Sequence, residues 1–237
     1  MKNKLINNLV CKKLRKILTK ILHRIRGGFR FPESVTAHKY LDGLRGIEIG
    51  GSESNSFGLN TLNIDYTDED NVFHQLDSKL SGKKALKVDI IANGDNLPFK
   101  DNVWDFVINS HVVEHFFDPI KVIEEWLRVI KPGGYLYMIV PHKIRTFDHN
   151  RQITFLQEII SRHNGELTMY DYGYNELDRY VLIKDNLIPT GFQRVLKDNH
   201  EHWNVWDTES FLELMTYMKL NVLEYQEIDD KVGTGLP

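Results

Sequence analysis

The stretch Gly46-Ile47-Glu48-Ile49-Gly50-Gly51-Ser52 decides the fold. Its first part predicts a short buried strand from Arg45 to Ile49, and this strand breaks into a pair of glycines. A glycine pair lets the backbone turn sharply and lets a ligand contact main-chain atoms that a Cβ would cover. In an open α/β sheet, ligands bind beyond the carboxyl ends of the strands, where this turn is expected to lie. The stretch therefore predicts a ligand-binding turn at the edge of a parallel sheet.

An acidic residue follows the next predicted strand. This strand runs from Thr61 to Ile64 and ends in Asp65, seventeen residues after Glu48. An acid at the tip of the second strand of such a sheet can accept hydrogen bonds from both hydroxyls of a ribose. The glycine turn and Asp65 together predict a nucleoside-binding site.

The rest of the chain continues the alternation of strands and helices. Further strands are predicted at Ala85–Ala92, Trp104–Asn109 and Tyr135–Val140, with a short helix at Ala37–Leu41 and a longer one from Asp118-Pro119 to Ile130. Lys131-Pro132-Gly133-Gly134 ends the longer helix. This order predicts an α/β fold, a Rossmann-like and largely parallel sheet with helices on both faces.

The segment after the fifth strand interrupts this rhythm. Residues 143–207 are long, polar and aromatic, and we interpret them as an insertion that covers a substrate. The tyrosines at positions 170, 172 and 174 alternate like one face of a strand. Asp207 is expected to cap a following helix, and Asn221–Ile228 to form a sixth strand.

Charge is distributed unevenly along the chain. The net charge of the 237 residues is -3, but residues 1–30 carry ten Lys and Arg and no acid, which leaves a net charge of -13 on residues 31–237. A nucleic-acid partner is therefore not expected, because its binding surface should be basic.

Residues 1–30 are predicted to form a basic amphipathic helix that ends at Gly27-Gly28, before a domain at 31–237. Such a helix can lie on an anionic membrane surface through residues 1–28, or it can pack on its own domain or on a second subunit. A targeting peptide is a third interpretation. The single cysteine, Cys11, cannot form an internal disulfide, so a reducing, cytoplasmic location is expected, with peripheral contact at the inner membrane face if the helix binds lipid.

Five motifs occur in register: Glu48-Ile49-Gly50-Gly51, Asp65, Gly94-Asp95-Asn96-Leu97-Pro98-Phe99, Ser110-His111-Val112-Val113-Glu114-His115 and Lys131-Pro132-Gly133-Gly134. Together they resemble the class I S-adenosylmethionine-dependent methyltransferases, particularly the small-molecule branch, over residues 44–142. Asn55-Ser56-Phe57-Gly58-Leu59, with the later His202 and Trp206-Asp207, is similar to methyltransferases found among bacterial surface-glycan enzymes.

The resemblance implies S-adenosylmethionine as the cofactor and a role for each matched position. Gly50 and Gly51 would face its methionine part, with Glu48 beneath them. Asp65 would hold the ribose hydroxyls.

The third and fourth motifs would complete the cofactor site. Asp95 would accept a hydrogen bond from the adenine amino group, with the Asn96 backbone nearby, and Ser110 and His111 would border the sulfonium. Ser52 stands where the family often has a further glycine, and the chain ends before the family's usual terminal hairpin.

Two other site classes fit parts of the sequence less well. His111-Val112-Val113-Glu114-His115 matches the H-x-x-E-H pattern of some zinc proteases, but Pro119 begins a new helix four residues later, where that site needs one long helix. A nicotinamide-binding Rossmann enzyme would need G-x-G-x-x-G, which is absent here.

Histidines supply the expected catalytic groups. His142 follows the fifth strand, near the expected methyl acceptor, and is the first candidate for a general base; His111 is the second. His200 and His202 with Asp148 could bind a metal, but such scattered residues are more often surface or core groups, so no metal site is predicted.

The expected function is transfer of a methyl group to a small polar acceptor, with a hydroxyl of a sugar or surface-glycan precursor favoured. An amine or a phosphorylated amino alcohol is the alternative acceptor, for which Arg145 and Arg151 could bind the phosphate. A hypothesis of another class is a non-catalytic scaffold that retains the fold and recruits partners through residues 1–30. Asp65 and Asp95 speak against it, because a scaffold needs neither.

Overall fold

The computed structural model describes residues 32–51, 57–67, 88–172 and 202–227. Its centre is a parallel sheet of five strands in the order β3-β2-β1-β4-β5. The strands are β1 (Gly46–Ile49), β2 (Thr61–Asp65), β3 (Ile90–Ile91), β4 (Trp104–Ser110) and β5 (Ile130–Ile139). The α/β prediction with a parallel sheet is confirmed. The predicted helix at residues 1–30 lies outside the described residues.

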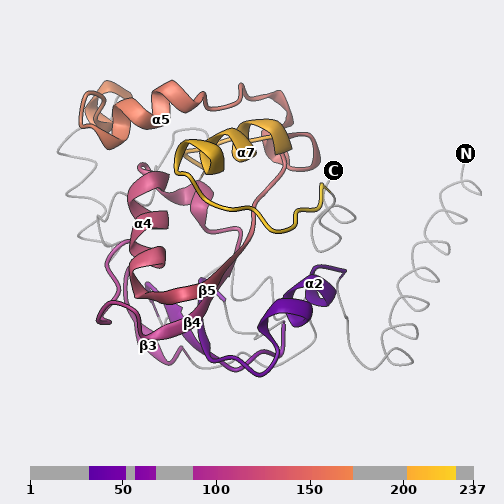
Figure 1. Ribbon diagram of the computed structural model, residues 1–237. Helices are drawn as coiled ribbons and strands as arrows, with labels where there is room; N and C mark the ends of the chain where they lie inside the picture. Colours follow the sequence, from indigo (N-terminus) through magenta and orange to yellow (C-terminus); the bar gives the residue numbers. More distant parts are fainter. Residues whose placement is uncertain (1–31, 52–56, 68–87, 173–201, 228–237) are drawn as a thin grey trace, which may run out of the picture.

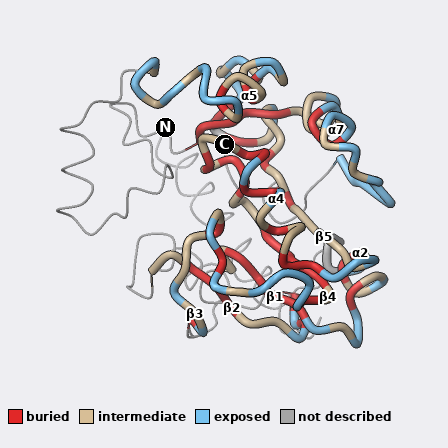
Figure 2. Tube along the Cα trace, turned by 60° about the vertical axis from the view of Figure 1, so that its left-hand side comes forward, coloured by how far each residue is buried: buried red, intermediate tan, exposed pale blue. Residues whose placement is uncertain are grey.

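Helices cover both faces of the sheet (Figures 1 and 2). Successive side chains of a strand point to opposite faces, so Val107 of β4 packs with helix α4 (Pro119–Val129), while Phe106 and Ile108 pack on the other face with α2 (Pro32–Leu41). Helices α5 (Leu156–His163) and α7 (Thr208–Tyr217) add to the α4 side.

Helix α4 begins as the sequence predicted. The Asp118 carboxylate accepts a hydrogen bond from the backbone N–H of Lys121, and Pro119 occupies the first turn, where its missing N–H costs nothing. The helix ends at Val129, but the residues that end it do not form a separate loop. They lie inside β5 as a wide bulge, since Trp104 pairs with Ile130 and Phe106 with Tyr135.

Close packing explains that bulge. A Cβ at Gly134 would lie 2.4 Å from the carbonyl oxygen of Asp105, and Lys131 Nζ donates to Asp105 Oδ1 at 2.7 Å. Residues 131–134 therefore stop the helix and hold the start of β5 against β4.

Three predicted elements differ in the structure. The predicted strand at 85–92 is confined, among the described residues, to Ile90–Ile91. Residues 169–172 form a 3₁₀ helix, η4 (Met169–Tyr172), instead of a strand face; Tyr174 lies outside the described residues. Residues 221–227 are extended and exposed but pair with no described strand, so the prediction of a sixth strand there is wrong.

The segment after β5 is compact where it is described. It contains η2 (Lys143–Arg145), η3 (Phe147–Asn150), α5 and η4. Another short helix, η1 (Val113–His115), lies between β4 and α4. Asp207 caps α7 as predicted, in a reciprocal pair of hydrogen bonds with Ser210. None of the helices in the described ranges has the length and apolarity needed to cross a membrane.

Candidate active site

The glycine turn leaves β1 in a conformation that other residues rarely adopt. Gly50 has φ +63°, and a Cβ there would lie 2.6 Å from Cγ2 of Val112. A Cβ at Gly51 would lie 2.8 Å from Asn63 Oδ1 and 2.8 Å from Cγ of the buried Glu48. Only glycines fit both positions without displacing the tip of β4 or the side chains below the turn.

The two predicted nucleoside-binding acids lie on the same side of β1. Asp65 is buried at the end of β2, and its Oδ1 accepts a hydrogen bond from the backbone N–H of Tyr66 at 2.7 Å. Asp95 stands in the turn after β3, where Lys121 Nζ donates to its Oδ2 at 3.2 Å. The N–H of Asn96 closes that turn on the carbonyl of Asn93 at 3.1 Å.

Helix α4 fixes the turn that carries Asp95. The indole Nε1 of Trp126 donates to the carbonyl of Gly94 at 2.9 Å, and Glu125 Oε1 accepts from the backbone N–H of Leu97 at 2.7 Å. Both bonds join the loop to a helix that is itself packed on the sheet. The position of Asp95 is therefore fixed by hydrogen bonds from its turn to α4.

The tip of β4 carries buried polar atoms in need of a partner. The Ser110 hydroxyl and both polar side-chain atoms of the fully buried Asn109 make no hydrogen bond within the described part of the chain. His111 follows with φ +57°, a left-handed conformation that is strained for a non-glycine residue. Asn109 was not singled out by the sequence analysis.

His142 lies beyond β5, as expected for a residue near a methyl acceptor. Its Nδ1 accepts a hydrogen bond from the backbone N–H of Ile144 at 3.3 Å, so the neutral ring carries its proton on Nε2. Burial and the nearby positive charge of Arg145 lower the pKa of His142, against an opposite effect of Asp207 and Glu227. In this state His142 presents an N–H donor, not a base.

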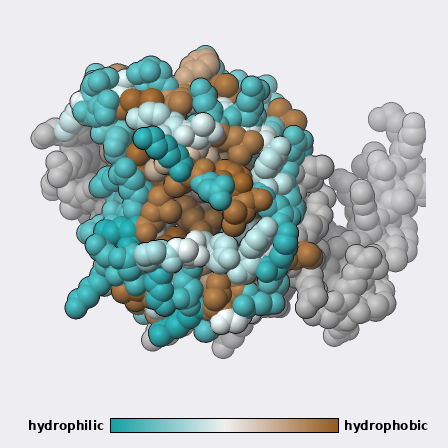
Figure 3. Space-filling view, viewed as in Figure 1, coloured by the Kyte–Doolittle hydropathy of each residue, from teal (hydrophilic) through white to brown (hydrophobic). Residues whose placement is uncertain are grey.

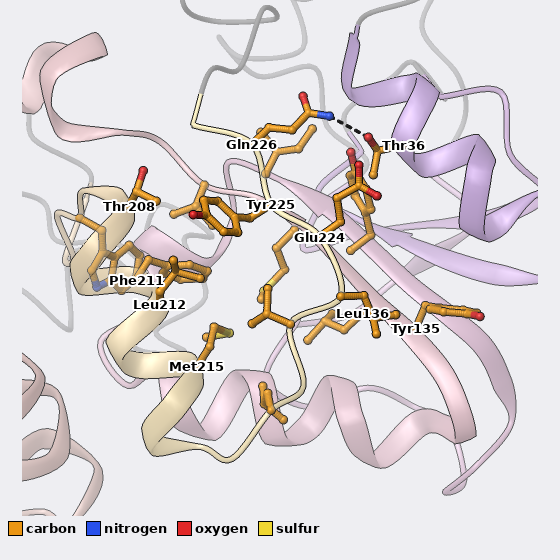
Figure 4. A pocket seen from close by; sticks show the side chains of 18 of the residues that line it. Thr36, Tyr135, Leu136, Thr208, Phe211, Leu212, Met215, Glu224, Tyr225 and Gln226 are labelled. Carbon is orange, nitrogen blue, oxygen red and sulfur yellow. Dashed lines mark hydrogen bonds between the residues drawn. The ribbon is translucent and has the colours of Figure 1, made fainter.

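His111 and His142 line one cavity of about 660 Å³. The cavity follows β5 and is closed by α7, by α2 and by residues 220–227 (Figure 3, the apolar hollow; Figure 4). Gln226 Nε2 donates to Thr36 Oγ1 at 2.7 Å and joins the last segment to α2. The apolar lining comprises Leu127, Leu136, Met138, Phe211, Leu212, Met215, Leu220, Val222 and Tyr225, among others.

Polar groups gather at the end of the cavity near the strand tips. They are His111, His142, Arg145, Thr146, Asp207 and Thr208. Further polar groups come from α2 and from the last described segment: Thr36, Asn221, Glu224, Gln226 and Glu227. A largely apolar lining with a few polar groups is typical of pockets for small molecules. Thus the structure brings both predicted catalytic histidines to one cavity, and it groups Asp65 and Asp95 separately, near β2 and β3.

Comparison with known proteins adds a direct indication of the family. Residues 51–138 match the family model for a methyltransferase domain. An uncharacterized protein of Methanocaldococcus jannaschii is 39% identical over 93 residues, 38% of this chain and 41% of the relative. A 2-methyl-6-phytyl-1,4-hydroquinone methyltransferase of Oryza sativa subsp. japonica is 35% identical over 114 residues, 44% of this chain and 31% of the relative.

The matched residues include β2, β3, β4 and most of β5, so this part of the sheet is similar to a methyltransferase domain. A solved structure of a SAM-dependent methyltransferase from Thermotoga maritima is 16% identical, with a TM-score of 0.41, and the match covers 78% of this chain and 68% of that one. The chain spans less than half the length of the two curated relatives described above.

The residues at this edge of the sheet fit S-adenosylmethionine, the cofactor of the class I methyltransferases. The glycine turn follows β1, and Asp65 stands at the strand tip next to it. The Ser110 hydroxyl, which lacks a partner among the described residues, stands at the tip of β4, on the other side of β1. Ser52, where the family often has a further glycine, lies outside the described residues.

A second polar centre lies next to the tip of β4, in a place that sequence reasoning missed. Glu114 is fully buried in η1, and three imidazoles surround its Oε1 atom. The distances from Oε1 are 3.6 Å to His111 Nδ1, 3.7 Å to His115 Nε2 and 3.8 Å to His202 Nε2. The H-x-x-E-H pattern contained the signal for three of these residues, because a short turn of helix places positions 111, 114 and 115 close together.

His202 reaches this centre from the last part of residues 143–207. Its Nδ1 lies 2.6 Å from Oδ2 of the buried Asp148, and Arg151 donates both to Asp148 Oδ1 at 2.6 Å and to the carbonyl of His202 at 2.9 Å. Burial raises the pKa of Asp148, but the bonds from His202 and Arg151 outweigh burial, so the pKa lies below its ordinary value.

The buried Arg162 of α5 holds the same segment from the other side. Its guanidinium donates to Asn204 Oδ1 and to the Tyr172 hydroxyl at 2.9 Å each, and it pairs with Glu158. Asn204 Nδ2 in turn donates to the carbonyl of Phe116 at 2.6 Å. Residues 202–206 are therefore fixed against the tip of β4 by polar bonds at both ends.

Proposed function

We propose that this protein transfers a methyl group from S-adenosylmethionine to a hydroxyl of an acceptor bound in the cavity beside β5. The observation that carries the proposal is the place of the glycine turn at Gly50-Gly51, which follows β1 between the ends of β2 and β4, where Asp65 and Ser110 lie. When bound, the cofactor supplies an electrophilic methyl group on its sulfonium sulfur. The protein's task is then to hold the acceptor oxygen in line with that methyl group.

His111 is the better candidate for the general base. It lines the acceptor cavity, and its Nδ1 lies 3.6 Å from Oε1 of the buried Glu114, so the side chain is held at the tip of β4. The acceptor hydroxyl would give its proton to His111 as its oxygen attacks the methyl carbon and the carbon–sulfur bond breaks. His142, with Nδ1 engaged, would instead donate a hydrogen bond from Nε2 and orient the acceptor.

The lining of the cavity supports an acceptor with a polar head and an apolar body. Polar groups lie at the strand tips and on residues 221–227, and the walls along β5 and α7 are largely aliphatic and aromatic. A sugar hydroxyl carried on an apolar group, as in a lipid-linked glycan precursor, satisfies both halves. The phytyl hydroquinone in the name of the rice relative is another molecule of this shape, and it makes a phenolic hydroxyl the second candidate.

An amine or a phosphorylated amino alcohol is the alternative acceptor. Arg145 lines the cavity and can meet a phosphate there, whereas Arg151 is engaged with Asp148 and the carbonyl of His202. A catalytically inactive scaffold remains the alternative of another class. It predicts a folded protein that binds no cofactor.

Titration calorimetry with S-adenosylhomocysteine, the product form of the cofactor, tests the first step. Binding by the wild type and a loss of about 10–100-fold in Asp65→Asn are expected, because the neutral amide no longer accepts strongly from two ribose hydroxyls. Asp101→Asn, an exposed change far from the glycine turn, is the matched control. A folded wild type that binds neither cofactor form would contradict the proposal.

Labelled S-adenosylmethionine then identifies the acceptor class. Nucleotide sugars, lipid-linked sugars, prenylated hydroquinones and amino-alcohol phosphates form four separate pools. Label transfer to a lipid-linked sugar supports the favoured acceptor, and transfer only to the amine pool overturns O-methylation. His111→Gln should lower kcat with little change in cofactor affinity if it is the base.

A further inference from the structure

We propose that Glu114, His115 and His202 form a binding site for one divalent first-row transition-metal ion. Their ligand atoms lie within 4.8 Å of one another, and no other group of three such residues in the described part of the chain is as close. The three come from two segments that are 88 positions apart in the sequence and meet at the tip of β4.

The first argument is the state of Glu114. Its side chain is fully buried, and neither carboxylate oxygen has a hydrogen-bond partner among the described residues. Distances of 3.6 to 3.8 Å to the imidazole nitrogens are too long for hydrogen bonds. A buried carboxylate without such bonds is costly unless it is paired or coordinates a metal. A cation between Oε1 and the imidazoles removes this cost.

The second argument is distance. Ions bound at roughly 2.0–2.2 Å from oxygen and nitrogen donors hold neighbouring donors about 3.0–3.5 Å apart. The Oε1 atom of Glu114 lies 3.7 Å from His115 Nε2 and 3.8 Å from His202 Nε2, a few tenths of an ångström beyond that range. The rings of His115 and His202 are 4.9 Å apart, edge to face, so a small rotation of either ring brings its nitrogen into range.

The third argument is the support behind His202. A histidine that binds a metal through one nitrogen commonly donates from the other to a carboxylate, which fixes its tautomer. His202 does this: Nδ1 faces Asp148 Oδ2 at 2.6 Å, and Nε2 faces Glu114. Arg151 holds Asp148 in turn. Such supporting contacts are typical of the residues around a metal-binding histidine.

The donor set indicates the kind of ion. Two imidazoles and one carboxylate suit zinc, iron and other first-row dications, whereas magnesium and calcium prefer oxygen alone. Three protein ligands leave coordination positions for a further group. His111 and His115 are about a quarter exposed, so the centre is reachable from the His111 side, where the cavity begins.

The role of the ion, unlike its site, rests on the proposed methyl transfer. An acceptor oxygen bound to a dication loses its proton more readily, because the cation stabilises the anion. The acceptor would lose its proton to water, and its oxygen would bond to the methyl carbon as the methyl–sulfur bond breaks and leaves S-adenosylhomocysteine. A metal that binds the acceptor in this way would explain why this centre adjoins the tip of β4.

Metal binding is measured directly on the full chain, first treated with a chelator and then titrated with Zn²⁺ or with Co²⁺ as a spectroscopic probe. We expect one ion per chain in this site and a rise in Tm on binding. Glu114→Gln and His202→Gln should each weaken binding by more than the roughly 10–100-fold typical of lost outer partners, and Asp148→Asn by about that amount.

His163→Gln is the matched control, because His163 pairs with Asp118 outside the cluster. It should bind the ion as the wild type does. Equal affinities in the wild type, Glu114→Gln and His202→Gln would mean an adventitious surface site and would overturn the proposal.

The stability of Glu114→Gln also distinguishes a metal site from a buried carboxylate that binds no ion. If no ion belongs here, the change removes an uncompensated buried charge and the variant is at least as stable as the wild type under every metal condition. If an ion belongs here, the wild type gains a metal-dependent rise in Tm that the variant lacks. S-adenosylhomocysteine affinity, measured in parallel, distinguishes the two hypotheses, since metal binding without cofactor binding refutes only the methyl transfer.

Discussion

The Nδ1 atom of His202 lies 2.6 Å from Oδ2 of Asp148, although the two residues are 54 positions apart. Both side chains are buried, at 7% and 2% exposure, and Arg151 completes the group. The contact joins η3 to the segment before α7 and so closes the described part of the region after β5 onto the tip of β4.

Asp148→Asn is expected to lower the free energy of unfolding by about 1–3 kcal/mol, because a buried charged acceptor is replaced by a neutral amide. Asp101→Asn removes a carboxylate from a mostly exposed pair with Arg128 and should change it by less than about 1 kcal/mol. Urea unfolding at pH 7 measures both. Equal effects of the two changes would show that the buried Asp148 contact contributes no more to the free energy of unfolding than an exposed ion pair does.

Acid should weaken this contact in a defined window. The pKa of Asp148 lies below its ordinary value of about 3.9, so the folded state favours the charged form. Its contribution to stability is therefore complete above that ordinary value and is lost as the pH falls from there through the folded-state pKa. The stability difference between wild type and Asp148→Asn should shrink as the pH falls below about 4. A constant difference would refute the assignment.

The sequence predicted most of the sheet because its strands are short apolar runs that end in glycine, acid or serine. It did not predict the bulge at 131–134, since a Lys-Pro-Gly-Gly sequence is compatible with both a loop and a bulge, and only the register of Trp104 and Phe106 with β5 decides. The sixth strand was wrong for a similar reason. Residues 221–227 have strand-like composition, but the bonds of Glu224 and Gln226 to α2 hold them away from the edge of β5.

The places of the residues predicted to bind the cofactor followed from the sequence, because these residues are near the ends of predicted strands. The cluster at Glu114 was not, since it depends on His202, which reaches the tip of β4 only after the chain has passed through α5. Spacing along the chain says nothing about such a return. The pattern at positions 111–115 was visible in the sequence, but the contact of Glu114 with His202 was not.

The glycine turn offers a test that separates backbone strain from steric conflict. Gly50 and Gly58 have similar positive φ angles, +63° and +67°, but only Gly50 has a neighbour in the way, Val112. Gly58→Ala should cost about 1 kcal/mol, the price of the left-handed conformation alone. Gly50→Ala should cost about 1–3 kcal/mol more and lower cofactor affinity.

The double change Gly50→Ala with Val112→Ala supplies the control. It removes the methyl group 2.6 Å from the new Cβ and should restore part of the lost stability relative to the sum of the single changes. Unfolding in urea gives the coupling energy. Strict additivity would place the cost of Gly50→Ala in its φ angle alone.

Arg162 should be among the most sensitive buried positions. Arg162→Met leaves Asn204 Oδ1 and the Tyr172 hydroxyl without their donor, in a place that water does not easily reach. We expect a loss of about 3–5 kcal/mol, as for one partner removed from a buried ion pair. Lys39→Met, which breaks the exposed pair with Glu224, should cost no more than about 1 kcal/mol. Similar midpoints for the two variants would contradict the buried network.

His142 offers a test by pH, because its environment favours the neutral ring. Burial first and Arg145 second lower its pKa below the ordinary value of about 6.5. Between these two pKa values the unfolded chain binds the proton and the folded protein does not. Stability from this residue is therefore present above pH 6.5 and is lost as the pH falls through the folded-state pKa. NMR titration should find a His142 pKa below 6.5.

Arg145→Met should raise the pKa of His142 toward its ordinary value by removing the nearby cation, whereas Arg145→Lys keeps the charge and should leave it lowered. The resonance is assigned by its loss in His142→Asn, whose amide oxygen can still accept from the backbone N–H of Ile144. That variant should also lose the fall in stability between pH 6.5 and the folded-state pKa. If Arg145→Met and Arg145→Lys titrate alike, the charge of Arg145 has no part in the shift, and the donor role of His142 would then rest on the Ile144 bond alone.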